Sequence, residues 1–292
     1  MISLKRNFSS LSRVDASMAS VLAACATLVI VVLILIVLFL VKESLPVLRS
    51  VSFMQFLTDE SWHPTENLYG ALPMLVASLA ASFGAILLAG PLGIISAIFC
   101  RFYAPKWLAR WYRRLLELLA GIPSVVFGFW GLTVLVPLIA MWQPPGASLF
   151  TGILILLLMI LPTVALTSEA ALASVPLLYL NGAAVLGLSR KATILGVALP
   201  AAKGGILMGI LLATARALGE TMAVVMVSGN VIQIPHSVFD PVRTLTANIA
   251  LEMAYAAGNH RSALYICGLL LTLMIGVLAA LSVRLSGGHN HA

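Results

Sequence analysis

Long runs without a charged residue dominate this chain, and they alternate with short segments rich in Lys and Arg. A transmembrane helix needs about 20 consecutive apolar residues. The runs 16–41, 67–100 and 262–283 therefore each predict one membrane span. The run 118–168 is long enough for two spans, and the segment 142–146 (WQPPG) breaks it near its middle, because Pro and Gly mark turns and Trp favours the membrane interface.

A further span is expected at 204–228, where the apolar pattern continues around two charged residues, Arg216 and Glu220. Of all residues, 61% are hydrophobic and 9% are charged, and the mean hydropathy is +1.07. Soluble domains carry about 25% charged residues, and disordered chains combine low hydrophobicity with high charge. The sequence therefore predicts an all-α integral membrane protein with six transmembrane helices.

The basic residues indicate the orientation of these spans. With a cytoplasmic N-terminus, most of them lie in cytoplasmic segments, as the positive-inside rule requires, and an even number of spans returns the C-terminus to the cytoplasm. The net charge of +7 follows from this bias, so we expect no nucleic-acid partner. The cytoplasmic residues would be Lys5, Arg6, Arg13, Arg101, Lys106, Arg110, Arg113, Arg114, Arg190, Lys191, Lys203 and Arg284. The external ones would be Lys42, Arg49, Arg243 and Arg261.

Motifs for catalysis and for metal binding are missing from the sequence. The chain has no Gly-Lys dipeptide, so it lacks the GxxxxGK[ST] phosphate loop, and GxSxG and HExxH are also missing. Cys25, Cys100 and Cys267 are too scattered for a metal site, and His289 and His291 belong to a polar tail. We expect a transport protein, not an enzyme, that takes its energy from a partner or an ion gradient.

The predicted cytoplasmic loop 174–203 is unusually apolar. Pro176 suits the first turn of a short helix, and Gly187 suits a left-handed stop. Ser189 can cap a second short helix, which Pro200 would end. The apolar side chains need a cover, which is either the protein's own spans or a cytoplasmic partner that docks on the loop.

The segment 101–116 is short and strongly basic. We interpret it as a cytoplasmic loop that orients the neighbouring spans and contacts anionic lipid head groups. Membrane lipid is therefore an expected partner of the chain.

An amphipathic helix is expected in the external stretch 229–261. Asp240 offers an N-cap, and Pro241 suits the first helical position. Gly258 would end the helix. Apolar residues recur at helical spacing between these points, namely Val242, Leu245, Ile249, Met253 and Ala256.

Two charges lie inside the predicted span 204–228. Arg216 and Glu220 are four residues apart, so they share one helix face, and Arg216 would lie near the middle of the bilayer. A charged side chain at that depth costs free energy to insert, so it is treated first as a candidate functional residue. The pair either locks helix packing or lines a translocation pathway. Glu169 is a second buried acid, for which Arg216 is one candidate partner across the bundle.

The loop 174–203 resembles the cytoplasmic EAA-type signature of bacterial ABC importer permeases. Gly187 and the dipeptide Leu199-Pro200 match that signature in spacing. Asn181 and Gly182 stand where the family has an acidic residue and its first alanine. The resemblance implies that this loop couples the chain to a partner ATPase. The implied coupling residues are Asn181, Gly182, Ala183, Gly187, Leu199 and Pro200.

Longer stretches narrow the resemblance to the phosphate permease subfamily, and to its PstC-type rather than its PstA-type subunit. They begin at residue 121 (GIPSVVFG), at 216 (RALGETMA) and at 241 (PVRTLTANIA). The chain is thus identified as a member of the phosphate ABC importer permeases, with the type I fold. The implied organisation has three parts. They are 1–70 (N-terminal segment, first span and external loop), 71–284 (five-helix permease core) and 285–292 (polar tail).

The resemblance implies a bacterial inner-membrane importer that moves phosphate by alternating access. Its implied partners are a PstA-type second permease, a dimer of ATP-binding subunits and an external phosphate-binding protein. ATP would be used by the partner, and this chain would bind no cofactor directly. The implied substrate pathway consists of Arg216, Glu220, Thr221 and Glu169. The implied external mouth consists of Arg243, Thr244 and Asn248.

Other functions stay open at this point. A permease of the same class could carry another oxyanion, such as sulfate or molybdate. An ion-coupled secondary transporter or channel is a different class, against which the apolar internal loop argues. A membrane scaffold or sensor that reports phosphate to a signalling kinase is a third class, and it is compatible with transport.

Overall fold

The computed structural model describes residues 13–49 and 51–287, and its architecture is a helical bundle with one small hairpin. The residues 1–12 and 288–292, which include part of the predicted polar tail with His289 and His291, lie outside the described residues. The long helices are α1 (Arg13–Leu48), α3 (Leu72–Ile98), α7 (Leu149–Ala173), α10 (Leu199–Gly219) and α13 (Gly258–Gly287).

Short elements connect the long helices. The helical ones are α2 (Phe53–Thr58), α4 (Lys106–Gly121), α5 (Ser124–Trp130), α6 (Val136–Ala140), α8 (Leu177–Val185), α9 (Arg190–Thr193), α11 (Met222–Val227) and α12 (Leu245–Glu252). The hairpin pairs β1 (Trp62–His63) with β2 (Leu68–Tyr69) in antiparallel register around a 3₁₀ turn at Pro64–Glu66. Three π-helical turns lie at Phe99–Tyr103, Gly131–Leu135 and Ile194–Ala198.

The described residues contain 5 helices that are long and apolar enough to cross a membrane, or up to 6 when one bent pair is counted as a span. The predicted all-α membrane fold is therefore confirmed, with five or six candidate spans where six were predicted. The bent pair is Lys106–Gly121 with Ser124–Ala140, and its two parts meet at 91°. The turn at 142–146 separates it from α7, as predicted, with Gly146 in the left-handed region at φ +82°.

The basic segment 101–116 is not a loop, which corrects the prediction. Most of it belongs to α4, which packs along α7. Charge density suggested a loop, but the basic residues of α4 share one face of the helix while Leu116 on another face is buried. An amphipathic helix of this kind tolerates many charges because they need not face the core.

The span predicted at 204–228 begins and ends earlier than predicted, since its helix stops at Gly219. Pro200 does not end a short helix but lies in the first turn of α10, so that one continuous helix runs from Arg190 to Gly219. The π-helical turn Ile194–Ala198 precedes Pro200 directly, and the turn Gly131–Leu135 stands in the same relation to Pro137. A π-turn re-spaces the hydrogen-bond ladder, so the missing N–H and the ring of proline are accommodated.

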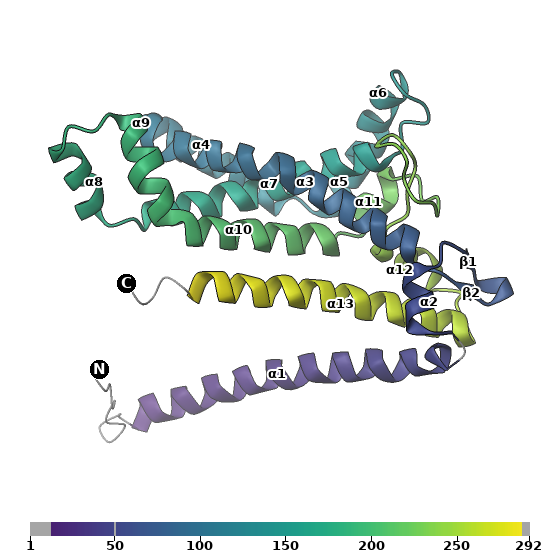
Figure 1. Cartoon of the computed structure of the whole chain (residues 1–292). Helices are drawn as coiled ribbons and strands as arrows, with labels where there is room; N and C mark the ends of the chain where they lie inside the picture. Colours follow the sequence, from purple (N-terminus) through teal and green to yellow (C-terminus); the bar gives the residue numbers. More distant parts are fainter. Residues whose placement is uncertain (1–12, 50, 288–292) are drawn as a thin grey trace.

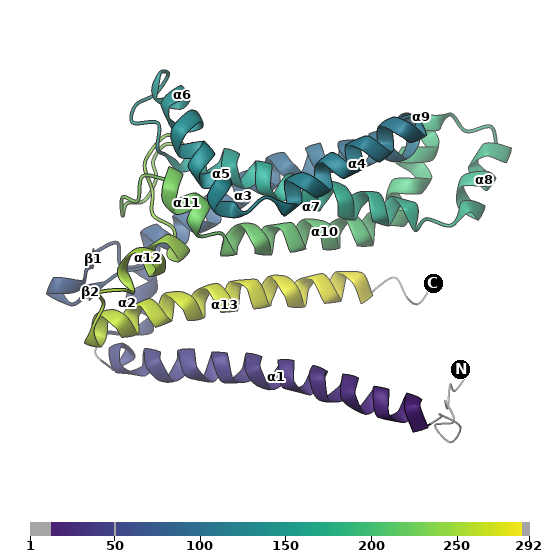
Figure 2. The ribbon, with the colours of Figure 1, turned by 180° about the vertical axis from the view of Figure 1, so that it is seen from behind.

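Small residues bring the central helices close together. α3, α7 and α10 pack against one another at the centre, and α1 lies outside α13, as Figures 1 and 2 show. A buried stripe of alanines at intervals of four residues faces α7 from α3, which lets the helix backbones approach closely. A Cβ added at Gly93 would lie 2.7 Å from Val164 Cγ1 of α7. The alanine stripe consists of Ala77, Ala81, Ala85 and Ala89.

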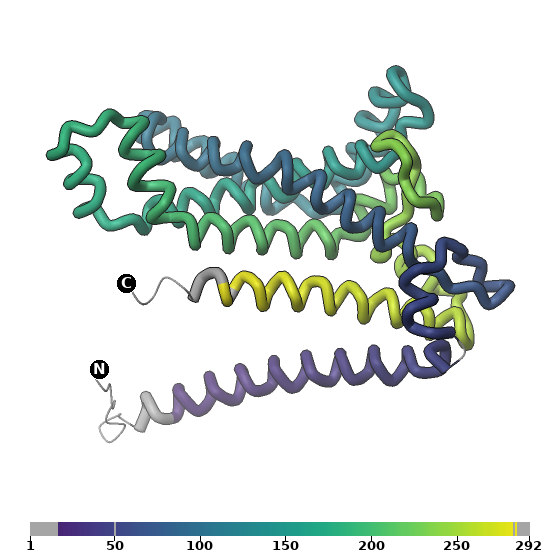
Figure 3. The backbone as a smooth tube through the Cα atoms, in the orientation of Figure 1, coloured from purple at the N-terminus to yellow at the C-terminus, as the bar shows by residue number. Residues whose placement is uncertain are grey.

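The bundle has two distinct ends, which the tube in Figure 3 makes easy to follow. We call them the α8 end and the hairpin end. α8 projects beyond the spans at the first, where α1 also begins and α13 also ends. At the second, α2, the hairpin and α12 pack into one hydrophobic cluster around Phe56, Trp62 and Leu245.

The predicted helix in 229–261 exists as α12, but its ends differ from the prediction. Thr244, not Asp240, is the N-cap, because its hydroxyl accepts a hydrogen bond from the Ala247 N–H. Asp240 instead accepts from the N–H groups of His236 and Ser237 in a preceding turn. The helix ends at Glu252, and Gly258, with φ +55°, begins α13.

Candidate functional site

The α8 segment is the most exposed apolar feature at the α8 end. In Figure 1 it stands clear of the spans at the end of the bundle. Leu178 is 77% exposed and Val185 is 88% exposed, whereas Ala183 is buried. The alternative in which the protein's own spans cover these side chains is therefore wrong for α8.

The turn after α8 has the two features that the sequence predicted, a left-handed glycine and a helix N-cap. Gly187 adopts φ +71°, in the left-handed region that glycine enters without strain. The hydroxyl of Ser189 accepts a hydrogen bond from the Ala192 N–H and so caps α9. The structure brings the six predicted coupling residues into one continuous segment. Asn181, Gly182 and Ala183 lie on α8, Gly187 lies in the turn, and Leu199 and Pro200 lie in the first turn of α10.

Arg216 and Glu220 do not form the predicted pair on one helix face. α10 ends at Gly219, and Glu220 has the extended backbone angles φ −70° and ψ 130°. Its Oε1 accepts hydrogen bonds from the N–H groups of Thr221 (3.1 Å) and Ala223 (3.4 Å), so it caps α11. Within the described residues the Arg216 side chain forms no ion pair or hydrogen bond, and it is exposed.

A small polar pocket, too tight to hold a water molecule, lies beside the break between α10 and α11. Hydroxyl groups from α3 and α12 meet Glu220 there. Thr246 Oγ1 donates to the Glu220 carbonyl oxygen at 2.9 Å, and Ser78 Oγ accepts from the Leu245 N–H at 2.9 Å. The pocket thus joins the predicted pathway residue Glu220 to the predicted mouth residue Thr244. Its polar lining consists of Ser78, Ser82, Glu220, Thr244 and Thr246.

Sequence reasoning missed the two serines and Thr246 of this pocket. A signal was available for the serines, because Ser78 and Ser82 are four residues apart in an otherwise apolar run. Residues with that spacing share a helix face. Nothing local indicated that α12 would bring Thr246 to the same place.

A buried network around Glu252 holds the hairpin end together. The Glu252 carboxylate accepts hydrogen bonds from Trp62 Nε1 (2.9 Å) and Arg243 Nη1 (2.7 Å), and it pairs with His260 Nε2 at 2.8 Å. Arg243 Nη1 also lies 3.2 Å from Asn248 Oδ1. The side chains of Arg243 and Glu252 are only 18% and 9% exposed.

This network changes the picture of the predicted external mouth. Arg243, Thr244 and Asn248 do not project into solvent, since Thr244 and Asn248 are buried and Arg243 is committed to Glu252. They form the framework of the hairpin end, and their role at a mouth stays a prediction. Sequence reasoning did not find Trp62 or Glu252, because their partners are distant in the chain.

Glu169 pairs with Arg113 of α4 and not with Arg216. Arg113 Nε donates to Glu169 Oε2 at 3.1 Å, and Arg113 Nη2 bonds to Glu169 Oε1. Glu169 is buried, whereas the Arg113 side chain is 53% exposed. The candidate pairing with Arg216 is wrong, because Glu169 lies near the α8 end of α7 and Arg216 lies near the hairpin end of α10.

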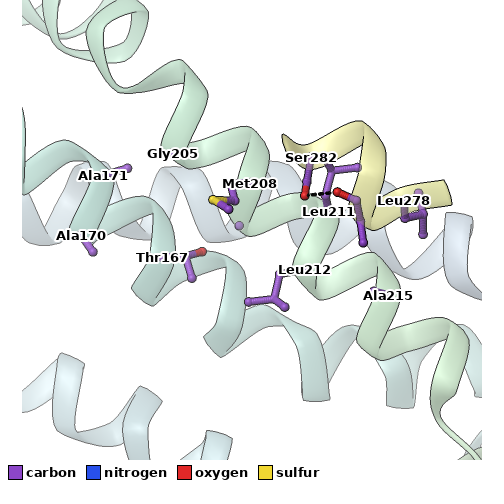
Figure 4. Close-up of a pocket in the computed structure, with 12 residues that line it drawn as sticks. Thr167, Ala170, Ala171, Gly205, Met208, Leu211, Leu212, Ala215, Leu278 and Ser282 are labelled. Atoms are coloured by element: carbon purple, nitrogen blue, oxygen red, sulfur yellow. Dashed lines mark hydrogen bonds between the residues drawn. The ribbon is translucent and has the colours of Figure 1, made fainter. Parts of the chain in front are cut away.

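An apolar groove of about 430 Å³ lies between α7, α10 and α13 at the membrane-facing surface. Figure 4 shows Met208 and Leu212 of α10, Thr167 of α7 and Leu278 of α13 around it. The two hydroxyl groups that line the groove, those of Thr167 and Ser282, each donate to a carbonyl of their own helix, so neither is free to hold an anion. Among the described residues, no group of three or more His, Cys, Asp or Glu could hold a metal ion.

These features define a helical protein with several candidate membrane spans, and comparison with known proteins gives its family. The chain belongs to the binding-protein-dependent transport system inner membrane component family, whose model matches residues 89–287. The family description and the candidate spans place it in the inner membrane as a multi-pass protein. The description also implies a separate substrate-binding protein.

Relatives of this family are permease subunits of ABC transporters. The chain is 40% identical to the probable ABC transporter permease protein YqgH of Bacillus subtilis, over 87% of this chain and 85% of that protein. It is 36% identical to the phosphate transport system permease protein PstC of Mesorhizobium japonicum, over 92% and 88%. It is also 36% identical to PstC of Pasteurella multocida, over 78% of each chain.

Solved structures share the fold at low sequence identity. A chain of the MetNI methionine ABC transporter, in an inward-facing conformation, superimposes with a TM-score of 0.58 at 17% identity. The match covers 78% of this chain and 99% of that one. The expected fold of an ABC importer permease is confirmed.

Proposed function

We propose that this chain is the PstC-type permease subunit of an ATP-driven phosphate importer. The observation that carries the proposal is its 36% identity, over 92% of its length, to a phosphate transport system permease protein. The proposed complex contains a PstA-type second permease, two ATP-binding subunits and an external phosphate-binding protein. ATP would be hydrolysed by the partner, and this chain would be a transport subunit without an ATPase site or a cofactor.

In the proposed orientation both termini and the α8 end are cytoplasmic. The basic residues support this orientation, because Arg101, Lys106, Arg110 and Arg190 gather at the α8 end. The hairpin end would then face the phosphate-binding protein. The exposed leucines of α8 would dock on the ATPase, since an exposed apolar helix is a typical protein-binding surface.

The proposed coupling runs along one helix. The turn at Gly187 leads directly into the continuous helix Arg190–Gly219, which ends beside Glu220. At 1.5 Å per residue this helix is about 45 Å long. A displacement of α8 by the ATPase would therefore be carried as a rigid movement to the break between α10 and α11, where it would open or close the pathway.

Arg216 is the proposed contact for the passing anion. Its guanidinium has no partner within the described residues, and its fork of donors matches a phosphate oxyanion. Glu220 would act through its cap on α11, which positions Thr221, and not by holding Arg216. Glu169 would hold α4 at the cytoplasmic end of the pathway through Arg113.

Reconstitution of the complex in liposomes tests this proposal. Phosphate uptake should require the ATPase and the binding protein, and Arg216→Gln should reduce uptake at least about tenfold, because a charge-assisted hydrogen bond contributes about 1.5–3 kcal/mol. Arg261→Gln is the matched control, since Arg261 is also exposed and its guanidinium interacts with the Tyr265 side chain one turn away on the same helix.

Two results would contradict the proposal. Uptake by the chain alone, without any ATPase, would favour an ion-coupled transporter. Full inhibition of labelled phosphate uptake by equimolar sulfate or molybdate would favour a permease for a different oxyanion.

A further inference from the structure

The outer surface of α4 carries two adjacent stripes of opposite chemistry. Trp107, Trp111, Leu115 and Leu118 follow one another at helical intervals and form an apolar stripe, of which Trp107 is 63% and Leu118 is 69% exposed. Residues at such intervals lie on one face of a helix. The third face of α4 packs inward through Leu116, which is buried. The apolar stripe therefore has no cover within the described residues.

The second stripe is cationic. Lys106, Arg110 and Arg114 are each one helical position away from a residue of the apolar stripe, and all three are exposed. The guanidinium of Arg114 lies over the Trp111 ring, 5.6 Å from its centroid. Arg113 is not counted among these unpaired basic residues, because it forms an ion pair with Glu169. Glu117, which is also exposed, lies one turn from Arg114 on the same side of α4, so Lys106, Arg110 and Arg114 outnumber the acid and the stripe keeps a net positive charge. The two stripes leave one helix surface that is half apolar and half basic.

We propose that this surface of α4 is a binding site for anionic phospholipid. An amphipathic helix with Trp and Leu on one face and Lys and Arg beside them fits the boundary between acyl chains and head groups. Trp prefers that boundary, and basic side chains near a membrane surface attract anionic lipids. The chain lies in the inner membrane, so lipid meets its lateral surface, and the positive stripe complements a phosphodiester head group.

The position of α4 in the bundle supports lipid as the occupant. α4 begins at the α8 end, where the spans terminate, and it packs along α7. Two more exposed side chains, those of Arg190 and Tyr103, lie at this end. The Arg190 guanidinium stacks over the Tyr103 ring, 5.4 Å from its centroid. Free phosphate shares the oxyanion chemistry, but it does not need the uncovered Trp and Leu stripe. The lipid is therefore the better match to the whole surface.

Lipid selectivity of the full-length chain in nanodiscs tests the proposal. Quenching of tryptophan fluorescence by brominated phosphatidylglycerol is compared with quenching by brominated phosphatidylcholine. The wild type should prefer the anionic lipid, and Arg110→Gln/Arg114→Gln should reduce that preference roughly 30-fold, at about 1 kcal/mol for each basic residue near a charged surface. Lys191→Gln/Lys203→Gln removes the same charge from exposed positions at the same end and should keep the preference.

The competing occupants give different results. Trp107→Phe/Trp111→Phe should remove the difference in quenching between the two lipids, and the quenching that stays should come from exposed Trp130 and Trp142 outside α4. Equal quenching by both lipids in the wild type would overturn the proposal, as would an equal loss in the control pair. Displacement of the anionic lipid by millimolar inorganic phosphate would assign the basic stripe to free phosphate, and tryptophans that no lipid quenches would assign the apolar stripe to a protein partner.

Discussion

Replacement of Glu252 by Gln should loosen the hairpin end without unfolding the bundle. The carboxylate joins Trp62 of β1, Arg243 and His260 of α13 through contacts of 2.9, 2.7 and 2.8 Å. Gln keeps the size of the side chain but removes the charge that Arg243 faces. Arg243 is only 18% exposed, so water replaces the lost partner poorly.

The expected cost is about 3 kcal/mol, at the low end of the 3–5 kcal/mol typical when one member of a buried ion pair is removed. The lower value is appropriate because Arg243 retains its bonds to Asn230 and Asn248. A loss of about 3 kcal/mol corresponds to roughly a hundredfold change in an opening equilibrium. Amide hydrogen exchange in β1, β2 and α12 should therefore become about a hundredfold faster, with little change in α3 and α7.

Two controls make this prediction sharp. Glu66→Gln removes an exposed acid from the same hairpin and should leave exchange unchanged. Glu252→Gln/Arg243→Gln should recover part of the loss, because the uncompensated charge is gone. Unchanged exchange in Glu252→Gln would refute the reasoning, and so would equal acceleration in α7, since the network would then hold the whole bundle.

Three further predictions concern other parts of the bundle. Arg113→Gln should loosen α4 from α7 at a cost of about 3 kcal/mol, because it leaves the buried Glu169 carboxylate without its cationic partner. Maleimide should then label the buried Cys100 faster in a Cys25→Ala background, and unchanged labelling would refute this. Gly209→Ala should cost about 1–3 kcal/mol by overpacking, since its Cβ would meet Thr167 Oγ1 at 2.1 Å. Gly276→Ala, with open space around it, should leave the thermal midpoint unchanged. Val185→Asp on α8 should keep the thermal midpoint of the chain within error, because Val185 is 88% exposed, but should abolish co-purification of the ATPase. A fall in the midpoint would show instead that α8 packs on its own bundle.

The sequence was sufficient where a feature depends on a short stretch of chain. Charge-free runs predicted the spans, because the membrane selects each helix by its own length and polarity. Gly187 and Ser189 shaped their turn as expected, since left-handed geometry and N-caps depend on one residue and its neighbours. The uncovered side chains of α8 also agree with one of the two alternatives that its apolar composition allowed.

Predictions from single residue types failed where the surrounding chain changes the effect of that residue. Pro200 is a helix breaker by itself, yet the preceding π-turn lets the helix pass through it. The basic residues of α4 suggested a loop, but they lie on one face of a packed helix. Asp240 is a suitable N-cap, yet Thr244 occupies that position, because the chain first closes a turn on Asp240.

Only the tertiary structure decided which charges meet. Glu169 pairs with Arg113, Glu252 pairs with Arg243 and His260, and the Arg216 side chain stays without a partner within the described residues. A sequence states which charges exist and what each would cost in the membrane. It does not state which helices become neighbours or at what depth two side chains lie, because helix packing sets both, and packing depends on contacts between residues far apart in the chain.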